Sequence, residues 1–166
     1  MRTLLLLFIL PFLIHPQETS AQAAGNYEDM EQRFTKARLS PQDSAAFRKQ
    51  GEHKVRQLFE NGSFYAANQN VSANQVYVTQ QTQPLFQAAQ ADTINYNALL
   101  QQISQAQCKG RVQLQTDAAP KLLGTTRTLN CTPEVVIDLV LTRNSKKFGK
   151  TSEQVWEVQL ANPRIR

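Results

Sequence analysis

The side chains of this chain that could carry out chemistry are few. Two histidines are present, His15 and His53. His53 stands between Glu52 and Lys54 in a stretch with helical spacing, which is typical of a solvated helix face. A hydrolytic site needs a nucleophile, a base and a group that orients the base, and this stretch offers only the base. We therefore predict no catalytic residue and favour binding over catalysis.

Metal and cofactor sites are not indicated either. Outside residues 1–23, one histidine and two cysteines that lie far apart, Cys108 and Cys131, do not match the ligand spacing of a zinc site. A glycine-rich stretch that could cradle a phosphate group is also missing from the sequence. We predict no metal ion and no cofactor.

The carboxylate of most interest is Asp138, because it interrupts the apolar stretch 134–142. An acid covered in a pocket could shuttle protons or bind a ligand. Tyr65 and Tyr77 are predicted to line the same cavity. The alternative places Asp138 at a rim that faces water, or pairs it with a nearby arginine.

A second candidate site is the basic stretch 143–150, which has one aromatic residue and no acid. Its four cations are Arg143, Lys146, Lys147 and Lys150. A hairpin tip of this composition could contact nucleic acid, anionic glycans or membrane headgroups. The alternative is a solvated loop that keeps the edge of a sheet soluble.

The two cysteines predict a disulfide from hairpin geometry. Segments 109–116 and 123–131 flank a turn at 117–120, which contains Asp and Pro. Antiparallel pairing about this turn places Cys108 directly opposite Cys131, within disulfide reach. Such a bridge would stabilise the fold by on the order of 3 kcal/mol. The alternative is two unpaired, buried thiols.

The same register assigns the faces of the hairpin. Val112 and Leu114 share the face of Cys108, and Leu129 shares the face of Cys131. Arg127 also falls on this face, where a charge fits badly.

Two further strands complete a four-stranded antiparallel meander. Residues 134–142 are apolar on both faces, which is typical of a central strand. After a polar loop, residues 154–160 alternate as a half-buried strand does.

Helices are predicted to precede the sheet. The segments 26–38 and 40–60 form a helical hairpin, and the second of them ends at Asn61-Gly62. A third helix starts at Asp92 or Thr93 and ends near Ala106. Between them, Phe64-Tyr65 and Val76-Tyr77-Val78 are predicted as short strands. Helices followed by strands define an α+β fold. This order of elements resembles that of cystatin-like and nuclear-transport-factor-2-like folds, in which a curved sheet wraps around a helix.

The N-terminus predicts export. Arg2 precedes an apolar run from Leu4 to Ile14, which is too short to span a bilayer. Ala21-Gln22-Ala23 fits a cleavage site, so residues 1–23 are predicted to be a secretory signal peptide and 24–166 a single domain. The mature protein would be secreted or periplasmic, where a disulfide can form. Asn61, Asn70 and Asn130 begin sequences that would accept a glycan in a eukaryotic secretory pathway.

The net charge of +5 is mild and suggests only weak attraction to anionic surfaces. We therefore expect a small exported binding or accessory domain. Its partner would be a protein or a small apolar ligand, held in a concavity between helix and sheet. The alternatives are a small enzyme that uses one pocket acid, and a polyanion binder that uses residues 143–150.

Overall fold

The computed structural model describes residues 39–119 and 122–166. The chain divides into two compact units, Met1–Ser40 and Pro41–Arg166, and the elements described below belong to the second unit. The predicted signal peptide and the predicted helix at 26–38 lie outside the described residues.

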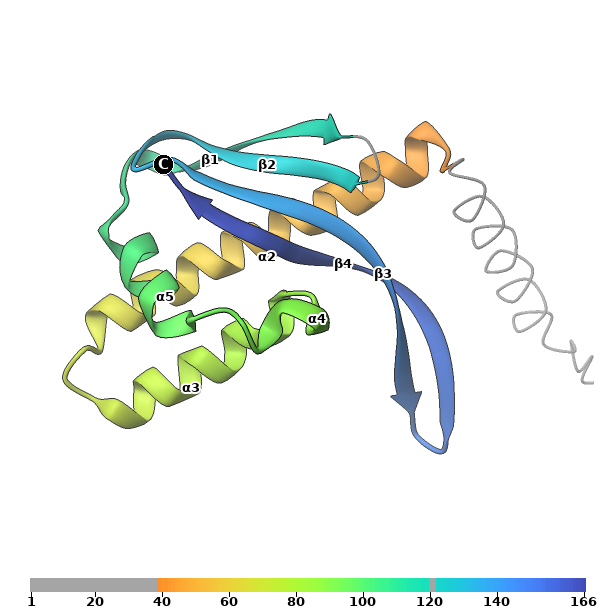
Figure 1. Cartoon of the computed structure of the whole chain (residues 1–166), viewed down its shortest axis with the longest axis horizontal. Coiled ribbons are helices and arrows are strands. Elements are labelled where there is room, and N and C mark those ends of the chain that lie inside the picture. Colours follow the sequence, from red (N-terminus) through yellow and green to blue (C-terminus); the bar gives the residue numbers. More distant parts are fainter. Residues whose placement is uncertain (1–38, 120–121) are drawn as a thin grey trace, which may run out of the picture. The chain divides into compact units, whose positions relative to one another are not determined.

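Helices come first in the chain and strands follow (Figure 1). The helical elements are α2 (Pro41–Ala67), α3 (Ser72–Thr82), the 3₁₀ helix η1 (Gln83–Leu85), α4 (Ala88–Ala91) and α5 (Tyr96–Gln105). The strands are β1 (Gln107–Ala119), β2 (Leu122–Thr132), β3 (Val135–Phe148) and β4 (Thr151–Ile165). They form one antiparallel sheet in the order β1-β2-β3-β4. The predicted α+β class and the four-stranded meander are confirmed.

Helix α2 is longer than the sequence predicts. It begins at Pro41, where the fixed backbone of proline suits the first helical position. The predicted end at Asn61-Gly62 is wrong, because α2 continues to Ala67. Gly62 is buried against α5, and a Cβ at this position would lie 2.8 Å from Cγ2 of Ile103. The glycine therefore permits close helix packing and does not end the helix.

The short strands predicted at Phe64-Tyr65 and Val76-Tyr77-Val78 are wrong, because these residues lie in α2 and α3. Helix α3 buries a narrow strip that consists of Val78 and Thr82. The Thr82 hydroxyl donates a hydrogen bond to the Val78 carbonyl, one helical turn earlier, over 2.8 Å. β-Branched and aromatic residues favour a strand locally, but packing against the neighbouring elements decides in favour of a helix.

The third predicted helix is α5, which begins at Tyr96 and not at Asp92 or Thr93. Asn95 caps this helix, because its side chain accepts a hydrogen bond from the backbone N–H of Ala98 over 3.1 Å. The predicted apolar face is confirmed by the buried residues Tyr96, Leu99, Leu100 and Ile103.

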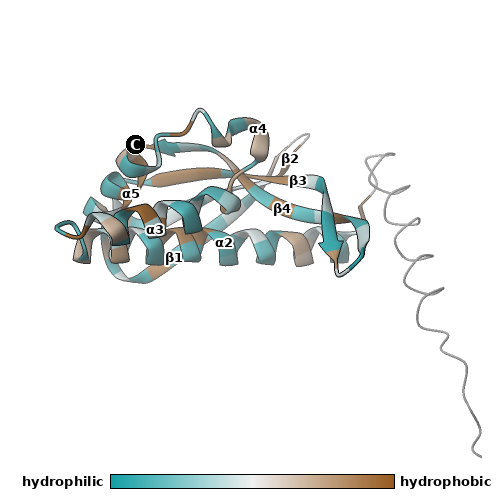
Figure 2. Cartoon of the chain, turned by 90° about the horizontal axis from the view of Figure 1, so that it is seen from below, coloured by the Kyte–Doolittle hydropathy of each residue, from teal (hydrophilic) through white to brown (hydrophobic). Residues whose placement is uncertain are grey.

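Helix α2 contacts all four strands and organises the core. Gly51 permits a close approach to the sheet, since a Cβ there would lie 2.6 Å from Cδ1 of Leu139. In Figure 2 the apolar part of β3 lies over α2, and the hydrophilic part belongs to the far end of the β3–β4 hairpin. The most deeply buried aliphatic side chains come from α2, α5, β3 and β4: Val55, Leu58, Leu100, Val135, Ile137, Leu139, Val158 and Leu160.

The β1–β2 register agrees with the prediction only at the start of β1, where Gln107 is paired with Thr132 and Cys108 with Cys131. Cys108 is paired with Cys131, but an irregularity follows, and the next pair is Gln113 with Leu129. Asn130 has a positive φ of 59°, which interrupts the alternation of side chains between the faces of β2. The predicted faces of Arg127 and Leu129 are therefore wrong, because both residues are exposed. The charge of Arg127 therefore does not lie on the face of the cysteines, where it would fit badly.

The polar loop predicted between the last two strands is wrong. Strands β3 and β4 remain paired from Arg143–Trp156 to Phe148–Thr151, and the turn is confined to Gly149-Lys150. Gly149 has a positive φ of 62°, which suits a tight turn. We call residues 143–156 the arm. Figure 1 shows the arm projecting away from α3, α4 and α5.

Candidate functional site

Asp138 is buried, and its carboxylate is fully engaged. Its neighbour Leu139 meets α2, and adjacent side chains of a strand point to opposite faces, so Asp138 faces away from α2. One oxygen forms an ion pair with Arg164 and accepts a hydrogen bond from Thr125 Oγ1 over 3.2 Å. The other accepts from Asn162 Nδ2 over 3.0 Å. This is the arginine-paired arrangement considered as an alternative.

The two tyrosines predicted beside Asp138 lie elsewhere. Tyr65 is buried on α2, which packs on the opposite face of the sheet. Tyr77 lies on α3 and is 57% exposed. The structure therefore does not bring the three residues together. His53 is exposed on α2, as predicted for a solvated helix face.

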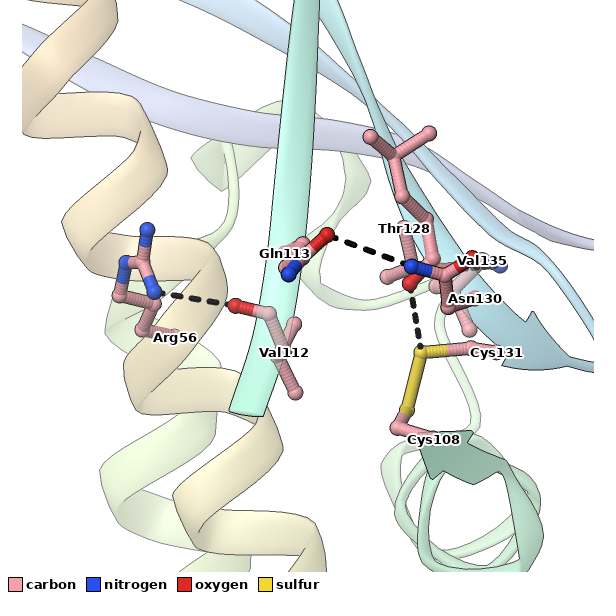
Figure 3. Close-up of a disulfide and its surroundings, with 9 residues drawn as sticks. Arg56, Cys108, Val112, Gln113, Thr128, Asn130, Cys131 and Val135 are labelled. Atoms are coloured by element: carbon pink, nitrogen blue, oxygen red, sulfur yellow. Dashed lines mark hydrogen bonds between the residues drawn. A yellow bond between two sulfur atoms is a disulfide. The ribbon is translucent and has the colours of Figure 1, made fainter. Parts of the chain in front are cut away.

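The predicted disulfide is confirmed, and it joins the start of β1 to the end of β2 (Figure 3). The Cα atoms of Cys108 and Cys131 are 4.0 Å apart. A disulfide is compatible with the predicted secreted or periplasmic location. Next to the bridge, the Asn130 amide donates to Gln113 Oε1 over 3.3 Å, which ties the two strands where their register shifts.

A hollow of about 710 Å³ lies beside the disulfide, between α2, α5 and the first half of β1. Its apolar walls include Phe59, Ile103 and Val112. Arg56, Arg111 and Glu60 supply its charged groups. Arg56 Nη1 donates a hydrogen bond to the Val112 carbonyl over 3.0 Å (Figure 3). This hollow lies between two helices and the sheet, and the sequence alone did not locate it.

The two edges of the sheet differ. At the β4 edge, Phe86 forms a parallel bridge with Leu160, and the Gln87 N–H donates to the Leu160 carbonyl over 2.9 Å. Gln90 extends this cover, because its side chain exchanges hydrogen bonds with Asn162 over 2.9 and 3.0 Å. Residues 86–90 therefore cover the edge at this part of β4.

The β1 edge has no such cover. Within residues 39–119 and 122–166, β1 pairs with β2 alone and contains no fully buried residue. A Cβ at Gly110 would meet nothing within 4 Å, so the space beside this residue is open. The Val112 carbonyl points away from β2, because Arg56 reaches it from α2. The backbone N–H and C=O groups of Leu114, two residues further along, point the same way.

At the base of the arm, Glu157 is held between two lysines. Lys54 Nζ lies 2.8 Å from Glu157 Oε1, and Lys146 Nζ lies 3.0 Å from Oε2. Burial raises the pKa of the Glu157 carboxyl, but the hydrogen bonds and charges of the two lysines outweigh it and lower the pKa to about 2. The carboxylate therefore clamps the arm to α2.

The four cations predicted as one basic site are separated along the arm. Arg143 lies opposite Trp156 at its base, and Lys146 is paired with Glu157. Lys147 and Lys150 lie at the tip, on either side of Phe148 and Gly149. The tip is therefore the part of the arm where positive charge gathers.

The three sequences that resemble glycan acceptors differ in accessibility. Asn61 lies inside α2, and its amide donates to Thr82 Oγ1 over 3.0 Å. Asn130 is exposed, and its amide is hydrogen-bonded within the sheet. Asn70 is exposed in the turn between α2 and α3, which is the setting that an acceptor needs.

No protein-family model, curated protein or solved structure matches the chain. The resemblance to cystatin-like and nuclear-transport-factor-2-like folds is therefore not confirmed. Among residues 39–119 and 122–166, no helix is long and apolar enough to cross a membrane. The same part of the chain has no group of three or more His, Cys, Asp or Glu side chains placed to hold a metal ion.

Proposed function

We propose that this chain is an exported accessory module that binds an extended acidic segment of a partner protein along β1. The observation that carries the proposal is the difference between the two edges of the sheet. Residues 86–90 cover part of the β4 edge, whereas the β1 edge opens onto the hollow. A partner segment would take the position at β1 that residues 86–90 take at β4.

The backbone of β1 supports binding by strand addition. Its outward groups near Val112 and Leu114 include N–H donors and C=O acceptors that an added strand can pair with. Main-chain hydrogen bonds give such complexes their affinity, and pockets for alternate side chains give them their specificity. The hollow beside Val112 is such a pocket, and Arg56 would have to release the Val112 carbonyl or bind the segment itself.

The charges around the edge favour an acidic segment. Lys109 and Arg111 are exposed on β1, and Arg56 lies on the facing side of the hollow. Glu60 is the only acid among the residues that line this hollow. Lysine and arginine on an edge strand also oppose pairing with a second copy of the same strand. These basic side chains would attract an acidic strand and would repel a second copy of β1.

A small apolar ligand in the same hollow is the second candidate, because Phe59, Ile103 and Val112 give it apolar walls. Phe59 and Ile103 are only 8% and 2% exposed, however, so little apolar surface remains for a ligand to cover. An enzyme that uses Asp138 as a single acid has less support, because both oxygens of this carboxylate already accept hydrogen bonds.

The proposal is tested with a fluorescein-labelled peptide of alternating glutamate and valine, whose binding is followed by fluorescence anisotropy. Val112→Pro removes an N–H that points away from β2, so the β1–β2 ladder stays intact while strand addition is blocked. We expect Val112→Pro to abolish binding. Arg111→Glu should weaken binding by about tenfold or more, because a like charge then faces the acidic peptide. Lys147→Glu, an equal change of charge on the arm, should leave binding unchanged.

Binding of the peptide to Val112→Pro with the affinity of the wild type would rule out strand addition. Failure of the wild type to bind the acidic peptide would contradict the proposal as a whole. Uptake of N-phenyl-1-naphthylamine, a neutral apolar dye, without peptide binding would favour the small-ligand candidate instead. Circular dichroism of each variant establishes that the fold is retained.

A further inference from the structure

The arm is an ordered hairpin that buries almost nothing of itself. From residue 145 to residue 154 every side chain is exposed. A two-stranded hairpin without a packed face is marginally stable in water. This one continues the β3–β4 ladder of the core and is clamped at its base by Glu157, Lys54 and Lys146. The fold thus maintains a projecting element whose distal half has no packing role in residues 39–119 and 122–166.

Charge is distributed unevenly along the arm. Near the base the signs are mixed, because Lys146 is paired with Glu157 and lies opposite Glu153 in the register. At the tip the sign is uniform, because residues 147–152 include Lys147 and Lys150 and no acid. A linear polyanion that ran along the arm would therefore meet repulsion from Glu153. Only a contact confined to the tip meets positive charge alone.

The tip also carries an exposed aromatic side chain. Phe148 is 52% exposed and lies directly before the turn at Gly149. Aromatic rings are favoured at the level of lipid headgroups, and lysines beside them are attracted by anionic lipids. An anionic lipid surface that only the tip contacts would bind both the aromatic and the cationic side chains. Nucleic acid or a sulfated glycan would account for the lysines, and neither requires an apolar group at the extreme end.

We infer that the tip of the arm, formed by Lys147, Phe148, Gly149 and Lys150, docks on an anionic lipid surface. Phe148 enters the headgroup layer, and the two lysines lie over the lipid phosphates and carboxylates. This site is separate from the β1 edge, because the tip belongs to the β3–β4 hairpin and shares no residue with β1. Each site is therefore tested by variants that leave the other unchanged.

The experiment is cosedimentation of the full chain with sucrose-loaded vesicles of phosphatidylcholine, either pure or with one-third phosphatidylserine. We expect binding to the mixed vesicles and little to the pure ones. Combined Lys147→Gln and Lys150→Gln should lower the partition coefficient about 25-fold, since each lysine near an anionic surface is worth about fivefold. Phe148→Ser should lower it roughly tenfold, because about half of the ring is left to bury. Arg111→Glu, on β1, is the matched control and should bind as the wild type does.

Insertion is measured separately with Phe148→Trp. Its fluorescence should be quenched by brominated lipids more strongly than that of the wild type, which contains Trp156 alone. Equal binding to both kinds of vesicle, or no binding to either, would overturn the inference. A third result would also overturn it. If Phe148→Ser binds vesicles like the wild type, and the double lysine variant no longer binds either vesicles or heparin, the tip is a site for polyanions in general.

Discussion

The substitution Glu157→Gln should remove the clamp between the arm and α2, together with the stability that the clamp provides. Glu157→Gln keeps the shape and the acceptor oxygen of the side chain but removes its charge. The pKa of Glu157 is lowered to about 2, against about 4.3 for an unfolded glutamate, by the two lysines. The full shift would correspond to about 3 kcal/mol. Because Glu157 is 23% and Lys146 48% exposed, we expect about 1–2 kcal/mol after screening by water.

The sign of the pH dependence follows from the lowered pKa. The contribution of Glu157 is fully present above the pKa of the unfolded side chain, near 4.3. It is lost as the pH falls through the folded value of about 2. The free energy of unfolding of Glu157→Gln should therefore lie below that of the wild type at pH 7, and the two should converge between pH 5 and pH 2.

The assay is urea unfolding followed by Trp156 fluorescence and circular dichroism, repeated from pH 7 to pH 2. The two proteins differ only at position 157, so the difference between their profiles isolates the contribution of Glu157. Glu153→Gln, an exposed carboxylate on the same strand, is the control and should change the free energy by less than about 0.5 kcal/mol. A Glu157→Gln protein as stable as the wild type at pH 7, or a pH profile parallel to it, would refute the clamp.

Two further perturbations address the core and the disulfide. Gly51→Ala should destabilise the fold by about 1 kcal/mol or more, because the new Cβ would lie 2.6 Å from Cδ1 of the buried Leu139 and the strain exceeds the gain in helix propensity. Thermal unfolding of Gly51→Ala should show a lower midpoint than that of the wild type. A higher midpoint would contradict the close approach of Gly51 to Leu139. Reduction of the Cys108–Cys131 bridge should lower the free energy of unfolding by on the order of 3 kcal/mol. Urea unfolding with and without reductant measures this loss, and a protein indifferent to reductant would contradict it.

The parts of the fold that the sequence predicts are those whose signal is local. Alternation of apolar side chains identifies the strand around Ile137, and hairpin geometry pairs Cys108 with Cys131 before any contact is known. The face of α5 is equally legible, because its spacing matches one turn of a helix. In each case, the residues that carry the signal are neighbours in the sequence or lie in one hairpin.

The parts that the sequence does not predict depend on contacts between distant elements. Gly62 resembles a helix end until Ile103 is placed against it. The arm resembles a loop, because a hairpin that buries no face has no apolar alternation to reveal it. The hollow is assembled from α2, α5 and β1, so no single stretch of sequence contains its pattern. Arg127 is the instructive case, since its poor fit in the predicted register was the local sign of the shift after Cys108.

Contacts between β4 and the helical part of the chain join residues that are far apart in the sequence. Gln90 and Asn162 are 72 residues apart in the sequence, and Lys54 and Glu157 are 103 apart. During synthesis the helices therefore emerge long before the strand that completes their packing. Until β4 is made, the part of α2 that packs on β4 stays uncovered, and contacts of such long range form slowly. A chain that still lacks β4 therefore exposes apolar surface that the finished fold buries, and such surface promotes aggregation.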